Sequence, residues 1–486
     1  MAASFFFYDL ETSGFSPIAA RIMQFAGQRT DENLKPIGDP IDVLIKLAPD
    51  VLPEPDAIML TGITPQSTIA EGLTEAEFLD YFYKEIVAPE TTFLGFNTVR
   101  FDDEFMRFLH YRNFYDPYEW QWANGCSRWD ILDLVRMTRA LRPDGIEWPV
   151  DDSGKPTNRL ELLTKVNGLN HDHAHDALSD VHATIAVAKL IRDKQPELFK
   201  YLFEGRNKKS ASALVTKKEA FVYTSGRYPG QYLHTTVAIM LAPHPQQDCA
   251  LVYDLRYDPT PFFAMSPEEL VDAWSYKKDR AEDDPRLPVK TLKYNRCPAI
   301  APLGVIKDKA IQQRIDMTLE TVSRHLEILK SNHQAFAKKV LDALALMDAS
   351  RERNLNKAAP TEATVDGLLY DGFFGPNDKQ TMSAVRAADA DAITDLASKF
   401  SDARLKQLAP LYKARNYPRT LSADERQAWE KHISGQLFEG GQDSKLSKYF
   451  TRLQELAADT LSSQQEYLLE ELQLYGESVV PSDIAE

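Results

Sequence analysis

Two carboxylates, Asp9 and Glu11, stand at the end of an apolar segment near the start of the chain. Side chains alternate between the two faces of a strand, so a strand over Ser4–Leu10 would direct both carboxylates to the same side. Adjacent carboxylates repel each other, and a divalent cation held by oxygen ligands would neutralise them. Taken alone, the pair is explained equally well by two exposed acids at a strand end.

A third acidic position occurs where an apolar strand is expected to run through a turn into a helix. The strand is predicted within Glu85–Phe96 and the helix over Asp102–Tyr111. Asp102, or its neighbour Asp103, could extend from the helix start toward the same metal. Aspartate is also a preferred N-cap residue, so a purely structural role accounts for this position equally well.

The fourth acid, Asp180, lies in the first turns of a predicted apolar helix over Ala177–Arg192. From there it could reach a metal, and His175 precedes it by about one helical turn. Taken alone, His175 would be interpreted as a surface or capping histidine. No cysteine stands near enough to complete a zinc site with the neighbouring histidines, which are His171, His173 and His182.

Together these residues form an ordered pattern of D-x-E, a later Asp at a helix start, and H-x-x-x-x-D at a second helix. The order and the flanking apolar strands resemble the DEDDh 3′→5′ exonuclease superfamily. That resemblance implies an α/β fold of the RNase H-like, DnaQ type. The segment Thr61–Pro65 (TGITP) lies where these enzymes carry a loop that meets the terminal base.

Longer segments narrow the resemblance to bacterial exodeoxyribonuclease I and cover nearly the whole chain. They are NTVRFDDE, Tyr111–Tyr118, Ser127–Asp133, Ala140–Pro149, Asn158–Gly168, Tyr201–Lys208, Leu369–Phe374 and Tyr412–Leu421. The resemblance implies a DEDDh exonuclease domain at 1–195, an SH3-like β-barrel domain with helical insertions at 196–350, and an all-α C-terminal domain at 351–480. Around Ala211–Lys218 the match fades with an apparent small deletion, so the contacts of that loop are left unassigned.

The same resemblance implies an activity and a set of roles. The enzyme would form a C-shaped clamp on single-stranded DNA and degrade it from 3′ to 5′, processively releasing 5′-mononucleotides, with roles in DNA repair and recombination. Asp9, Glu11, Asp102 and Asp180 would hold two Mg²⁺ ions, for which Mn²⁺ can substitute. His175 would accept the proton of the attacking water.

Other residues are assigned to the substrate through the resemblance. Glu11 and Arg159 would bind the terminal nucleotide, the arginine through its phosphate. Contacts to the DNA strand would come from Arg107, Tyr118, Trp122, Arg136, Tyr201, Lys208, Lys293, Arg296 and Tyr370.

A formal net charge of −16 argues, by itself, against nucleic-acid binding. Basic segments with interleaved tyrosines answer this objection, because cations follow phosphates and aromatic rings stack on bases. They are found at Arg404–Arg419, at Arg286–Pro298 and around Arg206. A solvated basic face is the alternative for each of them. Some of these cations would instead bind the acidic C-terminal tail of the single-stranded-DNA-binding protein, which recruits this family.

The elements that must position these residues follow from length, composition and pattern. With 486 residues, 43% of them hydrophobic and 26% charged, the chain should form two or three globular domains. Strands and helices alternate to about residue 190, and long helices follow residue 376, including Leu421–His432 and Leu446–Tyr475. The residues between these parts predict the following short strands, helical insertions and linker: Phe221–Thr224, Thr236–Leu241, Ala250–Asp254 and Val289–Tyr294 as strands, Pro267–Lys277 and Ile311–Lys330 as helices, and Ala349–Ala363 as the linker.

The sequence also predicts a cytoplasmic monomer with no membrane association. Cys126, Cys249 and Cys297 are far apart, as expected of reduced thiols, and the N-terminus resembles neither a signal peptide nor a membrane span. Two other functions stay open. An exoribonuclease of the same fold would not need the additional domains, and a non-catalytic DNA-binding adaptor should have lost at least one metal ligand.

Overall fold

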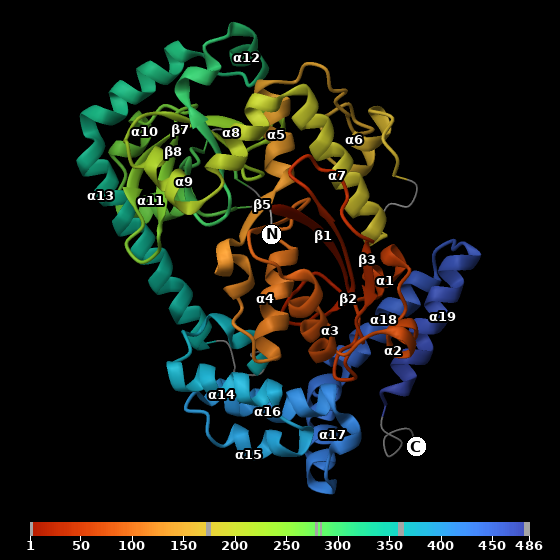
Figure 1. The fold of residues 1–486 in the computed structure, drawn as a ribbon. Helices are drawn as coiled ribbons and strands as arrows, with labels where there is room; N and C mark the ends of the chain where they lie inside the picture. Colours follow the sequence, from red (N-terminus) through yellow and green to blue (C-terminus); the bar gives the residue numbers. More distant parts are fainter. Residues whose placement is uncertain (1–2, 172–175, 278–279, 282–283, 358–363, 481–486) are drawn as a thin grey trace.

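The computed structural model describes residues 3–171, 176–277, 280–281, 284–357 and 364–480. Figure 1 shows a first sheet in the middle of the molecule, a second sheet beside it at the upper left, and C-terminal helices along the bottom and the right. The long helix α13 (Leu319–Lys357) connects the second sheet to the C-terminal helices. In the part of the chain that is described, no helix is both long and apolar enough to span a membrane.

The first sheet has five strands in the order β3-β2-β1-β4-β5. β1 pairs antiparallel with β2, and β2 with β3, whereas β4 runs parallel to β1 and to β5. β1 therefore lies at the centre, with its carboxyl end next to that of β4. The strands are β1 (Ser4–Thr12), β2 (Ile22–Thr30), β3 (Ile41–Leu44), β4 (Thr91–Gly95) and β5 (Ser127–Asp130).

Both faces of β1 are covered, which explains why its sequence begins with consecutive aromatic residues. Phe5 and Phe7 belong to the hydrophobic core on one face, which includes the helix α7 (Ala177–Lys194). Phe6 and Tyr8 belong to the core on the other face, which includes α4 (Asp102–Arg112). A strand that is buried on both faces is apolar at consecutive positions, and in β1 the acidic residues begin only at Asp9.

The remaining helices of this first part surround the sheet and continue into the second part. They are α1 (Pro55–Thr61), α2 (Pro65–Glu71), α3 (Glu75–Tyr81), α5 (Ile131–Leu141), α6 (Leu160–Val166), α8 (Pro196–Gly205) and α9 (Lys208–Val215). α9 covers most of the segment 211–218 that was expected to be a loop. Its N-cap residue, Asn207, accepts a hydrogen bond from the Ser210 backbone N–H, which starts the helix there.

The second sheet has the order β10-β6-β7-β8-β9, and all its pairings are antiparallel. Four of its strands were predicted, and β10 was not, because its four residues contain a proline and follow a turn. The strands are β6 (Phe221–Thr224), β7 (Thr235–Pro243), β8 (Cys249–Asp254), β9 (Val289–Lys293) and β10 (Ala299–Pro302). The inserted helices are α10 (Thr260–Phe263) and α11 (Pro267–Trp274).

The predicted helix over Ile311–Lys330 is two helices, α12 (Lys309–Arg314) and the 39-residue α13. α13 runs through Lys357 and so occupies much of the predicted linker Ala349–Ala363. Its first half buries Val322, Leu329 and Phe336. The segment after Ala349 contains no glycine or proline as far as Lys357, so it continues the helix without needing an apolar face.

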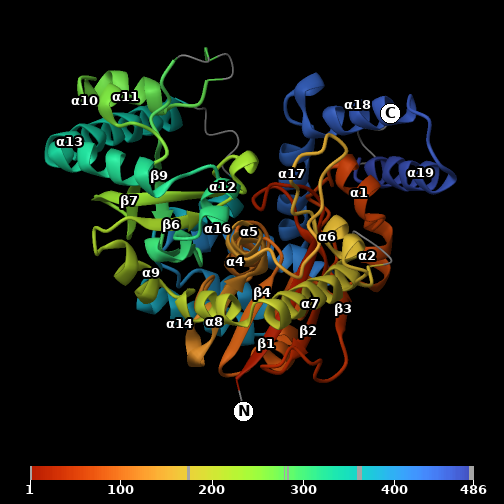
Figure 2. The same cartoon turned by 90° about the horizontal axis from the view of Figure 1, so that it is seen from above.

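The C-terminal part is helical, as predicted. The expected run Leu446–Tyr475 is interrupted where Ser462 caps a new helix through a capping box with Gln465. In both views α18 and α19 lie beside α1 and α2 (Figures 1 and 2). The helices are α14 (Pro376–Ala387), α15 (Ile393–Ala397), α16 (Ala403–Asn416), α17 (Ala423–Phe438), α18 (Lys445–Ala457) and α19 (Ser463–Ser478).

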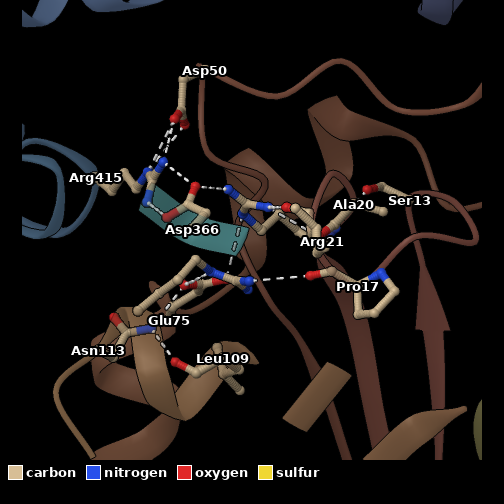
Figure 3. Close-up of polar contacts among 12 residues, drawn as sticks. Ser13, Pro17, Ala20, Arg21, Asp50, Glu75, Leu109, Asn113, Asp366 and Arg415 are labelled. Carbon is tan, nitrogen blue, oxygen red and sulfur yellow. Dashed lines mark hydrogen bonds and ion pairs between the residues drawn. The ribbon is translucent and has the colours of Figure 1, made fainter. Parts of the chain in front are cut away.

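A buried ionic network joins the first part to the C-terminal part (Figure 3). Asp366 accepts hydrogen bonds from Arg21 (2.8 Å) and from Arg415 (2.7 Å), and Arg415 also binds Asp50 at 2.6 Å. Nearby, Glu75 binds Arg112 at 2.7 Å. These six side chains, three arginines and three carboxylates, are each 10% exposed or less.

The network balances its own charge. Burial alone would raise the pKa of Asp366, but the Arg415 and Arg21 guanidinium groups outweigh it and lower the pKa to about 2. A buried ion pair adds little stability compared with an apolar core, yet removing one partner leaves an uncompensated charge.

We therefore expect Asp366→Asn to reduce the free energy of unfolding by about 3–5 kcal/mol, because two buried arginines lose a shared counter-ion. The measurement is urea unfolding followed by tryptophan fluorescence. The matched control is Asp56→Asn, which removes an exposed pair with Arg452 and should cost less than about 1 kcal/mol. Equal losses for the two variants would contradict this account.

Candidate metal and nucleic-acid site

Three of the four predicted metal ligands converge at the end of β1. One oxygen from each of Asp9, Glu11 and Asp180 lies within 4.8 Å of the others. Alternation along β1 places the first two on the face that α7 covers, and Asp180 is in the first turn of α7. The Asp176 side chain caps that helix by accepting a hydrogen bond from the Ser179 N–H, which fixes where the first turn begins.

The electrostatics of this cluster favour a cation. Burial, followed by the charges of Asp102, Glu11 and Asp180, raises the pKa of Asp9 well above its ordinary value. Burial and the charge of Asp180 raise the pKa of Glu11 to about 8. Carboxylates held this close are stable as anions only beside positive charge. An all-oxygen donor set suits Mg²⁺ or Mn²⁺, so the residues present fit a divalent metal.

Asp102, rather than Asp103, is the acid that faces the cluster. Asp103 accepts a hydrogen bond from the Tyr8 hydroxyl (2.7 Å) and forms an ion pair with Arg128, so its carboxylate is already engaged. Asp102 is the first residue of α4 and not its N-cap, which is Phe101. Burial raises the pKa of Asp102 to about 8. Asp102 lies outside the close group of three, although its charge acts on Asp9 more strongly than that of Glu11 does.

The predicted proton acceptor, His175, lies outside the described residues. A different histidine, His171, places its Nε2 atom 2.5 Å from Oδ1 of Asp180. The other ring nitrogen of His171 is 3.2 Å from the Thr164 hydroxyl oxygen. His171 was not among the predicted site residues, because the sequence showed only a histidine with no cysteine nearby to complete a zinc site. Nothing in the local pattern distinguishes it from its histidine neighbours as a partner of Asp180.

Three of the residues predicted to bind the DNA strand line one basic cavity of about 460 Å³, which lies between the first part of the chain and the second sheet. Arg136 comes from α5, Lys293 from the end of β9, and Arg296 from the connection to β10. Arg100 and Arg227 line the same cavity but were not predicted as strand contacts. Arg100 belongs to the NTVRFDDE segment, so its place between β4 and α4 was the available signal.

Three further predicted strand contacts lie together beside α4. The Arg107 side chain is only 5% exposed, and its guanidinium lies 5.3 Å from the ring centre of Tyr118. Tyr118 and Tyr370 line a smaller cavity, of about 90 Å³, together with the almost fully exposed Phe373. The contact with Tyr118 therefore shields the Arg107 guanidinium from solvent, while Tyr370 and Phe373 stay exposed.

The other predicted substrate contacts are more dispersed. Trp122 is 64% exposed and lines a separate cavity with Tyr83. Tyr201 on α8 and Lys208 at the start of α9 are not among the residues that line the basic cavity, and Lys208 pairs with Asp248.

Arg159, the predicted contact of the terminal nucleotide, immediately precedes α6, for which it is the N-cap residue. Its side chain is 70% exposed and lies 3.1 Å from a Glu161 oxygen. It is therefore available to solvent on the exonuclease part.

The basic segment Arg404–Arg419 has a largely structural role instead of forming a free cationic face. Lys413 is buried against Glu425 at 2.7 Å, and Arg415 belongs to the buried network. Arg404 pairs with Asp402 at 2.7 Å. The acids that neutralise these cations lie outside the segment in sequence, so its lack of acids was misleading.

Three family models match consecutive parts of the chain. The Exonuclease model matches residues 6–188, the Exonuclease I SH3-like domain model residues 206–345, and the Exonuclease I C-terminal domain model residues 363–479. The fold class and the family resemblance inferred from sequence are thereby confirmed.

Individual proteins match over almost their full length. The exodeoxyribonuclease I of Haemophilus influenzae is 38% identical over 478 residues, which cover 97% of this chain and 98% of that protein. The solved exonuclease I of Methylocaldum szegediense is 40% identical with a TM-score of 0.91, covering 99% of this chain and all of that one. Escherichia coli exonuclease I, solved with a dA16 oligonucleotide, is 37% identical with a TM-score of 0.90, covering 98% of this chain and 100% of that chain.

The carboxylate cluster predicts a pH-dependent stability. Because the folded-state pKa values of Glu11 and Asp102 are raised to about 8, their contribution to stability is full at low pH and is lost as the pH rises through 8. In EDTA, the melting temperature should fall by several degrees between pH 6 and about pH 9. Mg²⁺ should restore it, and more strongly at the higher pH.

The control for this melting experiment is Asp9→Asn, which removes one of the repelling charges. In EDTA at high pH this variant should melt above the wild type, and Mg²⁺ should raise its melting temperature less. An equal response of both proteins to Mg²⁺ would place the stabilising ion elsewhere.

Proposed function

This chain belongs to the exodeoxyribonuclease I family, and we propose that it hydrolyses single-stranded DNA processively from 3′ to 5′ and releases 5′-mononucleotides. The observation that carries the proposal is the convergence of Asp9, Glu11 and Asp180 at the end of β1. The cavity lined by five cations supports a polyanionic substrate. The dA16 oligonucleotide in the E. coli neighbour supports DNA as that substrate.

In the proposed reaction, Asp9, Glu11, Asp102 and Asp180 hold two divalent cations, Mg²⁺ with Mn²⁺ as a substitute. When bound, such ions activate water and neutralise charge on the phosphate and the leaving oxygen. A zinc-bound E. coli exonuclease I–single-stranded DNA complex among the neighbours supports a divalent site.

The chain's own groups supply the remaining requirements of hydrolysis. His175 accepts the proton of the attacking water, since a histidine titrates near neutral pH. Glu11 and Arg159 hold the terminal nucleotide, and the exposed guanidinium of Arg159 suits a phosphate. The cations of the basic cavity follow the phosphates of the incoming strand, while Tyr118, Trp122 and Tyr370 offer rings for the bases.

We extend the proposal to the setting of the reaction. The enzyme acts as a cytoplasmic monomer in DNA repair and recombination, and it is recruited by the acidic tail of the single-stranded-DNA-binding protein. A solved structure of SSB and exonuclease I with the inhibitor CFAM, whose exonuclease I chain matches this chain with a TM-score of 0.87, supports that partner.

The activity is tested with 3′-labelled single-stranded DNA, matched RNA and duplex DNA, each with Mg²⁺ or EDTA. Single-stranded DNA should be degraded from its 3′ end only when Mg²⁺ is present. Asp9→Ala should abolish hydrolysis and leave strand binding largely intact, because Asp9 lies outside the basic cavity. Equal cleavage of RNA would favour an exoribonuclease, and an inactive wild type that still binds DNA would favour an adaptor.

The basic cavity is tested separately through the salt dependence of binding. Lys293→Ala should weaken strand binding by about 3–10-fold and reduce the slope of log K against log salt by about 0.7. Fluorescence anisotropy across a salt series measures both. Lys277→Ala, which removes an exposed lysine paired with Asp272 in the same domain, should change neither quantity. An unchanged slope for Lys293→Ala would remove this cavity from the strand's path.

A further inference from the structure

Glu104 lies where the three parts of the chain meet. Its carboxylate accepts hydrogen bonds from Arg107 of the same helix at 2.6 Å and from Arg296 of the SH3-like domain at 2.5 Å. The hydroxyl group of Tyr370, from the C-terminal part, donates to the same carboxylate. A single side chain on α4 thus binds one donor from each domain.

All three donors are proposed contacts of the DNA strand, whereas Glu104 carries no role in the proposed function. A carboxylate that accepts from guanidinium groups presents them with much the same oxygen geometry as a phosphate does. We infer that Glu104 is a positioning residue that holds these three side chains together while no strand is bound. This inference rests on the proposed function, because it concerns the residues that would receive the strand.

The local charges explain why such a residue is needed. The Arg107 side chain is 5% exposed, and that of Arg296 is 28% exposed. Two cations gathered at one site repel each other unless an anion lies between them, and a poorly hydrated guanidinium is costly to leave without a partner. Glu104, whose side chain is 17% exposed, is the carboxylate that both arginines bind.

Glu104 also contacts a strap formed by residues 365–374, through the Tyr370 hydroxyl group. The start of the strap is held independently, because the Tyr111 hydroxyl donates to the Val365 carbonyl at 2.9 Å and Asp366 belongs to the buried network. Further along, Tyr370 is 55% exposed, and its ring packs against that of Phe108 in a T-shaped arrangement with ring centres 5.8 Å apart. The Arg404 guanidinium donates to the Leu368 and Gly372 carbonyls and holds the backbone on either side of Tyr370. The hydroxyl contact with Glu104 adds a tie for the Tyr370 side chain, which lines the small cavity together with Tyr118.

Positioning and simple electrostatics predict opposite signs for the loss of this charge. Removing a carboxylate next to a phosphate path adds one net positive charge, which alone would strengthen strand binding. If Glu104 positions its three partners, its loss separates them and weakens binding in spite of the more favourable charge. The sign of the change in affinity therefore decides between the two roles.

The experiment uses Glu104→Gln in the full chain. With a long single-stranded oligonucleotide, KM should rise about tenfold, or about 1.4 kcal/mol, with little change in kcat and with shorter processive runs. Hydrolysis of the p-nitrophenyl ester of thymidine 5′-monophosphate, which has no strand to position, should stay unchanged. The matched control is Glu455→Gln, which removes an exposed partner of Arg452 on α18 and should alter none of these values.

An unchanged or lowered KM would overturn the inference. So would an equal loss of activity on the nitrophenyl ester together with a lower melting temperature, which would mean a general structural role. The double variant Glu104→Gln, Tyr370→Phe should raise KM no more than the stronger single variant, because both substitutions disrupt the same Tyr370–Glu104 contact. Additive increases in KM would contradict the inference.

The proposed function and this inference fail separately. If the wild type degrades no DNA but Glu104→Gln still weakens strand binding in anisotropy, the proposed function is lost and the positioning role stands. If the wild type degrades DNA and the substitution leaves binding unchanged, the positioning role is lost.

Discussion

The buried network of three arginines and three carboxylates is the constraint on which the arrangement of the domains depends. Arg21 and Asp366 are 345 residues apart in the sequence, and their contact joins the end of the loop after β1 to the start of the strap. Arg21 is also tied to that loop because its backbone N–H donates to the hydroxyl group of Ser13, which closely follows Asp9 and Glu11. The same set of charges therefore connects the C-terminal part to β1 and its carboxylate cluster. Together with the hydrogen bonds from Arg404 to the Leu368 and Gly372 carbonyls, this connection places Tyr370 beside α4.

The central strand shows a second constraint, which is a conflict between stability and function. From Phe5 to Tyr8 its residues alternate between two cores and contribute apolar burial on both faces. At Asp9 and Glu11 the same alternation continues with carboxylates, whose pKa values rise because burial and mutual repulsion oppose ionisation. The apolar half of β1 is packed on both faces and so holds Asp9 and Glu11 in place in spite of their repulsion. A metal site of defined geometry would require ligands held in this way.

Sequence reasoning succeeded where the information was local. Strand alternation placed Asp9 and Glu11 on one face, the helix patterns located α4 and α7, and together they predicted a cluster that the structure forms from three of the four acids. It failed where contacts join distant segments. Within Arg404–Arg419, Arg415 is neutralised by Asp50 and Asp366, which lie far away in the sequence and which no inspection of the segment could reveal. The expected linker Ala349–Ala363 is helical as far as Lys357, and the sequence there has no apolar period that would have predicted this helix.

The shared network and core also limit how this chain can change in evolution. Met23 and Ile58 share an apolar cluster with Leu468 and Leu472, which holds α19 on the first part of the chain in addition to the ion pairs. A gene shortened after the second domain would encode a nuclease in which Arg21 and Asp50 lose their nearest partners, Asp366 and Arg415, and an apolar patch is open, which favours aggregation. The C-terminal helices are thus not an accessory that could be gained, lost or exchanged in one step. Descendants of this chain should keep all three parts or rebuild the seam between them, and change should accumulate in surface loops instead.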